Sequence, residues 1–178
     1  MGLNNKRDRL CLVQLSDGNG DVHLVKFEPG AYKAPRLIAL LTDTKRTKIF
    51  HFARFDLSIM RHYLGIHISP VYCTRTASRL ARTYTDKHGY KDICKELLGV
   101  EISKQQQSSD WGNETLTKEQ IEYAASDVLY LHKLMGKLNE MLVRECREEL
   151  LEACNNFLPY RAELDLAGFE NEDIFAHS

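Results

Sequence analysis

The segment IEYAASDVLYLHKL, residues 121–134, places Tyr123 four residues before Asp127 in an otherwise apolar, helix-forming run. On an α-helix, residues i and i+4 are neighbours, with Cβ atoms about 5–6 Å apart. Thr117 and Gln120 match the Thr-x-x-Gln capping box that starts a helix. The pair therefore lies in the second turn of a predicted helix, where the phenol and the carboxylate can reach one common point.

Strand and helix patterns alternate upstream of this segment in the order strand, strand, helix, strand, helix, strand, helix, which predicts an α/β fold and a single domain over residues 1–178. Residues 7–27 predict a hairpin, and residues 47–52 predict a buried strand before an amphipathic helix. Downstream, apolar residues with helical spacing predict one long helix from about residue 117 to about residue 156. We expect the tail at about 157–178, which is acidic with interspersed apolar residues, to pack on the core or on a neighbouring subunit.

Composition indicates an ordinary globular chain. Hydrophobic residues make up 43% of the 178 positions and charged residues 28%. The net charge of −1 argues against a protein that grips long nucleic acid, but it allows a substrate with few phosphates. We expect no membrane span, because no apolar run approaches the roughly 20 residues required. The five cysteines lack C-x-x-C spacing, which argues against a zinc site or a disulfide framework and favours the cytoplasm.

Four residues could carry chemistry, and each also has a plainer interpretation. Asp56 follows a strand at the kind of edge where α/β folds bind ligands, but it could simply cap the next helix. His51 could bind a ligand or be a packing residue of the strand. Tyr123 could be a core residue with its hydroxyl at the rim. Asp127 could face water, although its small apolar neighbours suggest close packing.

Basic residues are concentrated between positions 75 and 91, namely Arg75, Arg79, Arg82, Lys87 and Lys91. This stretch is either a solvated helix face or a contact for one or two phosphates. Lys104, in SKQQQSSDW, has the same two interpretations. G-x-S-x-G, H-E-x-x-H and Walker motifs are absent, so the sequence offers no motif for those chemistries.

Together these segments resemble the DEDD superfamily of 3′–5′ exonucleases, in its tyrosine-bearing, ribonuclease D-like branch. HFARFD, residues 51–56, is similar to the second exonuclease motif, and YAASD, residues 123–127, to the third, Tyr-x-x-x-Asp. The histidine-bearing branch would place a histidine at the position of Glu122. TYTDKHG, SKQQQSSDW and DIFAHS are most similar to the nano-RNase C group of alphaproteobacteria, which comprises oligoribonucleases and diribonucleases.

The resemblance implies a ribonuclease H-like fold, with a mixed sheet flanked by helices. It implies a cytoplasmic, octameric 3′–5′ exoribonuclease that hydrolyses very short single-stranded RNA to nucleoside monophosphates with two divalent cations, Mg²⁺ or Mn²⁺. Asp56 and Asp127 are the implied metal ligands. Tyr123 would orient the attacking water. The implied substrate-binding residues are Leu3, His51 and Lys104.

The first family motif, Asp-x-Glu followed three residues later by Gly-Leu, is incomplete. Gly2 and Leu3 resemble its end, so its two acids would lie upstream of Met1, on the first, central strand of the sheet. We expect the native protein to have roughly 25–30 further residues, about a strand and a leader. Three alternatives stay open: an impaired or inactive chain that retains nucleic-acid binding or an assembly role, a generic α/β structural domain, and trimming of DNA or tRNA.

Overall fold

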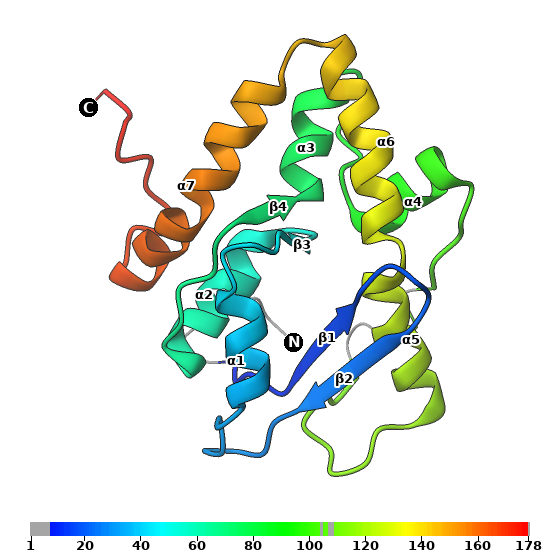
Figure 1. Cartoon of the computed structure of the whole chain (residues 1–178), viewed down its shortest axis with the longest axis vertical. Coiled ribbons are helices and arrows are strands. Elements are labelled where there is room, and N and C mark those ends of the chain that lie inside the picture. Colours follow the sequence, from blue (N-terminus) through cyan, green and yellow to red (C-terminus); the bar gives the residue numbers. More distant parts are fainter. Residues whose placement is uncertain (1–7, 104, 107–108, 178) are drawn as a thin grey trace.

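The chain adopts a mixed α/β fold, and the computed structural model describes residues 8–103, 105–106 and 109–177 (Figure 1). The order of its first elements is the predicted one. The elements are β1 (Leu12–Ser16), β2 (Val22–Lys26), α1 (Pro35–Thr42), β3 (Lys48–Phe50), α2 (Ala53–Leu64), β4 (Val71–Cys73), α3 (Thr74–Ala81), α4 (Tyr90–Leu98), α5 (Lys118–Leu129), α6 (Leu131–Arg144) and α7 (Glu148–Ala167).

The strands form two separate two-stranded sheets. β1 and β2 pair in antiparallel fashion as the predicted hairpin, whereas β3 and β4 pair in parallel. Within the described residues, no ladder joins the hairpin to the parallel pair. The expected central strand, with the Asp-x-Glu motif, lies outside these residues and stays a prediction.

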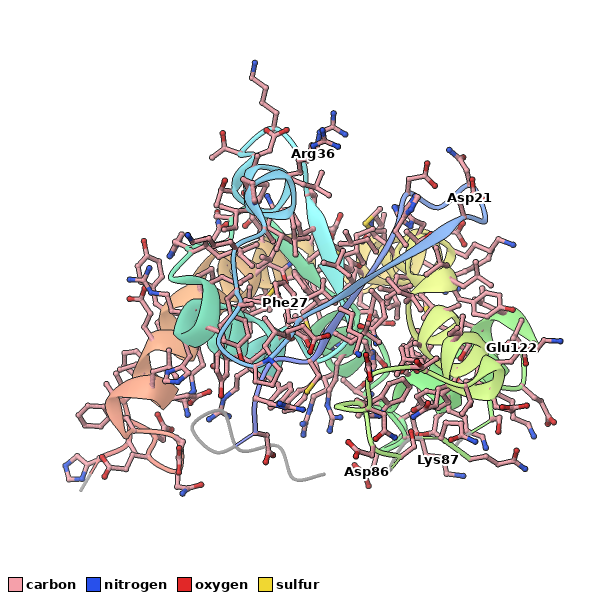
Figure 2. The ribbon with its side chains drawn as sticks, turned by 90° about the horizontal axis from the view of Figure 1, so that it is seen from below. Asp21, Phe27, Arg36, Asp86, Lys87 and Glu122 are labelled. Atoms are coloured by element: carbon pink, nitrogen blue, oxygen red, sulfur yellow. The ribbon has the colours of Figure 1, made fainter. Side chains whose placement is uncertain are left out.

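Helices connect the two sheets and build the core. α5 packs on the hairpin, α6 packs on α3, α4 and β3, and α2 packs against α7 (Figure 1). One apolar cluster joins the hairpin to α1 and α2; it includes Phe27, which lies in the interior in Figure 2. A second cluster joins α3, α4 and α6. α5 therefore lies on the hairpin and α6 lies in the second cluster, so the junction of these two helices connects the two parts of the fold.

The prediction of one long helix after residue 117 was wrong, although its start was right. Thr117 and Gln120 form both bonds of the capping box. The run then breaks at Tyr130, where φ is −104° and ψ is 1°, and again near Cys146, where φ is 52°. Apolar spacing continues across both breaks, so periodicity alone could not reveal them. At the first break, a hydroxyl from α4 enters the hydrogen-bond ladder.

α7 crosses the position near 157 where the tail was expected to begin. It is fixed to α2 by Arg54, whose Nε and Nη2 each donate to the buried Asp165 carboxylate at 2.6 Å. In the part of the chain that the structure describes, no helix has the length and apolar composition to cross a membrane. Large apolar side chains exposed on α7 and after it are Leu150, Phe157, Tyr160, Phe169, Ile174 and Phe175.

Candidate active site

The carboxyl edge of the parallel ladder holds His51. β3 and β4 end side by side, so His51 follows one strand and Thr74 the other. The Thr74 hydroxyl donates to the Phe50 carbonyl at 3.0 Å, so it accepts a hydrogen bond from His51 Nδ1 at 2.9 Å. That tautomer leaves Nε2 of His51 as a hydrogen-bond acceptor, and this atom is buried without a partner among the described residues.

His51 is neutral at physiological pH. Burial, followed by the charge of Arg75, lowers the pKa of His51 to about 4. The imidazole also packs against the ring of Tyr90, with centroids 5.5 Å apart. His51 is thus both a packing residue and a residue with a free acceptor atom.

Asp56 lies one turn inside α2. The N-cap of that helix is Phe52, which makes no side-chain capping bond, so the interpretation of Asp56 as the cap was wrong. Phe52 adopts the left-handed conformation at φ 66°, a strained state for a bulky side chain. The guanidinium of Arg75 lies 4.9 Å from the Phe52 ring centroid. A strained residue therefore directly precedes the helix that carries Asp56, and backbone strain of this kind is common at functional sites.

Asp56 and Asp127 come together from α2 and α5. Burial, and then the negative charge of Asp127, raise the pKa of Asp56 to about 7. Burial raises the pKa of Asp127 to about 6. Among the described residues, no cationic side chain forms a salt bridge with either carboxylate. Two half-buried carboxylates with raised pKa values are a donor set suited to a hard divalent cation.

Tyr123 is half-buried and close enough to Asp127 to feel its charge, whereas its neighbour in the chain faces outward. Figure 2 shows Glu122 on the outer side of α5, where it lies 3.7 Å from Lys118 Nζ. Burial, followed by the charge of Asp127, raises the pKa of Tyr123 to about 12, so the phenol stays protonated at neutral pH. Tyr123 therefore shares the electrostatic environment of Asp127, as their spacing predicted.

Sequence patterns did not identify the residues that support Tyr123. The Trp111 ring packs against the Tyr123 ring, with centroids 5.9 Å apart. Gln120 Nε2 donates to Ser109 Oγ and to the Asp110 carbonyl, each at 3.1 Å. The capping-box glutamine thus also fixes the segment that carries the tryptophan. The side chain is buried accordingly, with 4% of the Gln120 surface exposed.

Among the described residues, the site holds two carboxylates, Asp56 and Asp127, which are ligands of the kind that a hard divalent cation prefers. Within residues 8–103, 105–106 and 109–177, no group of three or more His, Cys, Asp or Glu side chains could hold a metal ion. Asp56 and Asp127 would therefore be two ligands of a larger set. Leu3 and Lys104, the other predicted substrate-binding residues, lie outside the described residues.

Arg82 is neither a solvated residue nor a free phosphate contact, so both interpretations were wrong for it. Its side chain is 0% exposed and forms an ion pair with Glu96. Its Nη1 donates to Ser78 Oγ at 2.9 Å and to the Lys87 carbonyl at 2.8 Å. These bonds hold the turn that carries Asp86 and Lys87 at the edge of the molecule (Figure 2). A charge pattern on a helix cannot distinguish such an anchor from its exposed neighbours.

Comparison with known proteins agrees with this geometry. A family model described as 3′–5′ exonuclease matches residues 1–143. Ribonuclease D of Gluconacetobacter diazotrophicus is 38% identical over 138 residues, which are 78% of this chain and 35% of that protein. This chain thus spans about a third of the length of the curated relatives it matches.

Solved structures show the same relationship. Brucella melitensis NrnC bound to pGG has a TM-score of 0.96 and 56% identity, over 99% of this chain and 86% of that one. The same nuclease with bound Mg²⁺ has a TM-score of 0.95 and 55% identity, over the same shares of the two chains. Escherichia coli RNase D has a TM-score of 0.75 and 26% identity, over 88% of this chain and 42% of that one. The chain belongs to the 3′–5′ exonuclease family, in its ribonuclease D-like part, with a ribonuclease H-like exonuclease fold.

Proposed function

We propose that this chain is a 3′–5′ exoribonuclease that hydrolyses very short RNA to nucleoside monophosphates with two divalent cations, Mg²⁺ or Mn²⁺. The observation that carries the proposal is the electrostatic coupling of Asp56 and Asp127, with Tyr123 on the same helix as the second acid. The Mg²⁺-bound relative supports the choice of metal.

Each residue has a defined part. Asp56 and Asp127 would hold the cations, which supply charge neutralisation and an activated water when bound. Tyr123 stays protonated, so it positions the water by hydrogen bonding and does not remove its proton. Neutral His51, at the carboxyl edge of the parallel ladder, is proposed to contribute to substrate binding. Leu3 and Lys104 are proposed to contact the terminal bases and a phosphate.

A short substrate agrees with the charge of the chain. The net charge of −1 does not provide the basic excess needed to neutralise many phosphates. A relative 56% identical was solved with pGG, whose name denotes two guanines. We further propose a cytoplasmic homo-oligomer, the octamer of the resemblance, because apolar side chains such as Leu150 and Tyr160 are more than half exposed on α7. Light scattering on the purified chain tests the assembly.

Hydrolysis of an end-labelled diribonucleotide with Mn²⁺ tests the activity. We expect release of mononucleotide that is lost on addition of a chelator and in an Asp127→Asn variant. Glu122→Gln is the matched control, because it removes an acid of the same helix that faces solvent. Release that persists in Asp127→Asn would contradict the proposed mechanism.

A second candidate is a catalytically impaired chain that binds short RNA. The small ligand number among the described residues favours it. Fluorescence anisotropy of a labelled diribonucleotide distinguishes the two: binding without Mn²⁺-dependent cleavage would establish this second function and exclude the first.

A further inference from the structure

Tyr90 is a half-buried tyrosine that contacts both His51 and the segment of α5 that carries Asp127. It opens α4, and its ring packs against His51 on the edge of the parallel ladder. Burial raises the pKa of Tyr90 above that of a free tyrosine, so its hydroxyl keeps its proton and can donate. The hydroxyl points away from His51 toward the junction of α5 and α6.

The hydroxyl replaces one hydrogen bond of the helix. In an unbroken α-helix the Tyr130 N–H would donate to the Ser126 carbonyl. Here the Tyr90 hydroxyl donates to the Ser126 carbonyl at 2.9 Å and accepts from the Tyr130 N–H at 3.2 Å. The Tyr130 N–H is shared with the Val128 carbonyl. A side chain inserted between these two groups accounts for the end of α5 at Leu129.

Asp127 lies inside the bridged segment, directly after Ser126. The Ser126 hydroxyl donates in turn to the Tyr123 carbonyl at 2.7 Å. A chain of hydrogen bonds therefore runs from Tyr90 through Ser126 to the turn that carries Tyr123 and Asp127. Fixing this turn fixes the Cα–Cβ bond of Asp127, from which the carboxylate extends toward Asp56.

We propose that Tyr90 is a positioning residue of the active site: its hydroxyl bridges Ser126 and Tyr130, and so holds Asp127 in the orientation that binds the metal ion. The role rests on the proposed function of the Asp56 and Asp127 pair. Tyr90 need not contact the substrate or the cation. It acts through the main chain: loss of a group that bonds a metal ligand directly weakens metal affinity about 10–100-fold, and we expect loss of the Tyr90 hydroxyl to fall at the lower end of that range.

The test compares Tyr90→Phe with Tyr72→Phe. Tyr72 belongs to the second apolar cluster, against which Tyr90 packs, and its hydroxyl donates to Asn139 Oδ1 at 2.7 Å. Both variants lose one hydroxyl from similar surroundings. By calorimetric titration with Mn²⁺ we expect affinity about tenfold or more lower in Tyr90→Phe and within about threefold of wild type in Tyr72→Phe. The turnover number should fall in parallel, with little change in KM.

Amide hydrogen exchange at single-residue resolution supplies a readout that needs neither metal nor activity. We expect the Tyr130 amide to be protected in the wild-type chain and in Tyr72→Phe, and to exchange about tenfold faster in Tyr90→Phe. Equal exchange in the two variants would overturn the bridge, and equal Mn²⁺ affinity would overturn its link to Asp127. An unprotected Tyr130 amide in the wild-type chain would also overturn it, whatever the folding of the variants. A wild-type chain that takes up no Mn²⁺ refutes the proposed function, and the exchange measurement then decides whether the Tyr90 bridge exists.

Discussion

Replacing Asp56 with asparagine should make the metal-free chain more stable at alkaline pH. The pKa of Asp56 rises from its ordinary value of 3.8 to about 7 in the folded chain, through burial and the charge of Asp127. The folded state therefore keeps this proton to a higher pH than the unfolded state. The stability contributed by protonated Asp56 is fully present below about pH 4 and is lost as the pH rises through 7.

The size of the effect follows from proton linkage. About three pKa units at 1.36 kcal/mol each give an upper limit of about 4 kcal/mol for the whole loss. Between pH 5 and pH 8 the share is about 2–3 kcal/mol. Asparagine still costs free energy to bury, but that cost does not depend on pH. The burial of Asp127 contributes to both proteins, and the repulsion between the two carboxylates is counted once, in the pKa of Asp56.

Urea unfolding in the presence of a chelator, followed by circular dichroism at pH 5 and pH 8, measures this difference. The stability of Asp56→Asn relative to wild type should rise by about 2–3 kcal/mol between the two pH values. Asp43→Asn is the control, because the backbone N–H of Lys45 lowers the pKa of the exposed Asp43 and its titration is complete below pH 5. A difference between Asp56→Asn and wild type that is the same at both pH values would refute the raised pKa of Asp56.

Three further substitutions test the surroundings of the site. Thr117→Ala removes the capping box and should cost about 1 kcal/mol of unfolding free energy, measured by urea titration against the exposed control Thr115→Ala; equal costs would contradict the cap. Arg82→Met removes a fully buried guanidinium and leaves its acceptors, Ser78 Oγ and the Lys87 carbonyl, unpaired; it should cost about 3 kcal/mol by the same assay, whereas Arg79→Met, at an exposed position, should change stability by less than about 0.5 kcal/mol. Trp111→Ala should lower the turnover number on a diribonucleotide about tenfold by releasing the Tyr123 ring, and Trp111→Phe should keep most of it; equal losses would argue against ring packing as the cause.

The sequence predicted those features whose cause is local. The capping box of Thr117 and Gln120 and the hairpin within residues 7–27 each depend on a few adjacent residues. The spacing of Tyr123 and Asp127 fixed their common face in the same way. Such local signals can be interpreted from the sequence without knowledge of the rest of the fold.

Features caused by distant residues could not be predicted. The break at Tyr130 depends on the hydroxyl of Tyr90, which is 40 residues earlier in the chain. The burial of Arg82 depends on Glu96 and on the turn that folds back over it. No periodicity encodes either contact, because each arises when two helices pack.

The bond between Arg54 and Asp165 links the first acid of the site to the order of protein synthesis. The two residues are 111 positions apart, and translation proceeds at about 5–20 residues per second. Asp165 is therefore synthesised about 5–20 s after Arg54, and during that time α2 lacks the bond that fixes it to α7. During this interval Ser58, which is 0% exposed in the finished fold, lacks the cover of α7. A delay of seconds thus separates the synthesis of Asp56 from the synthesis of the residue that anchors its helix.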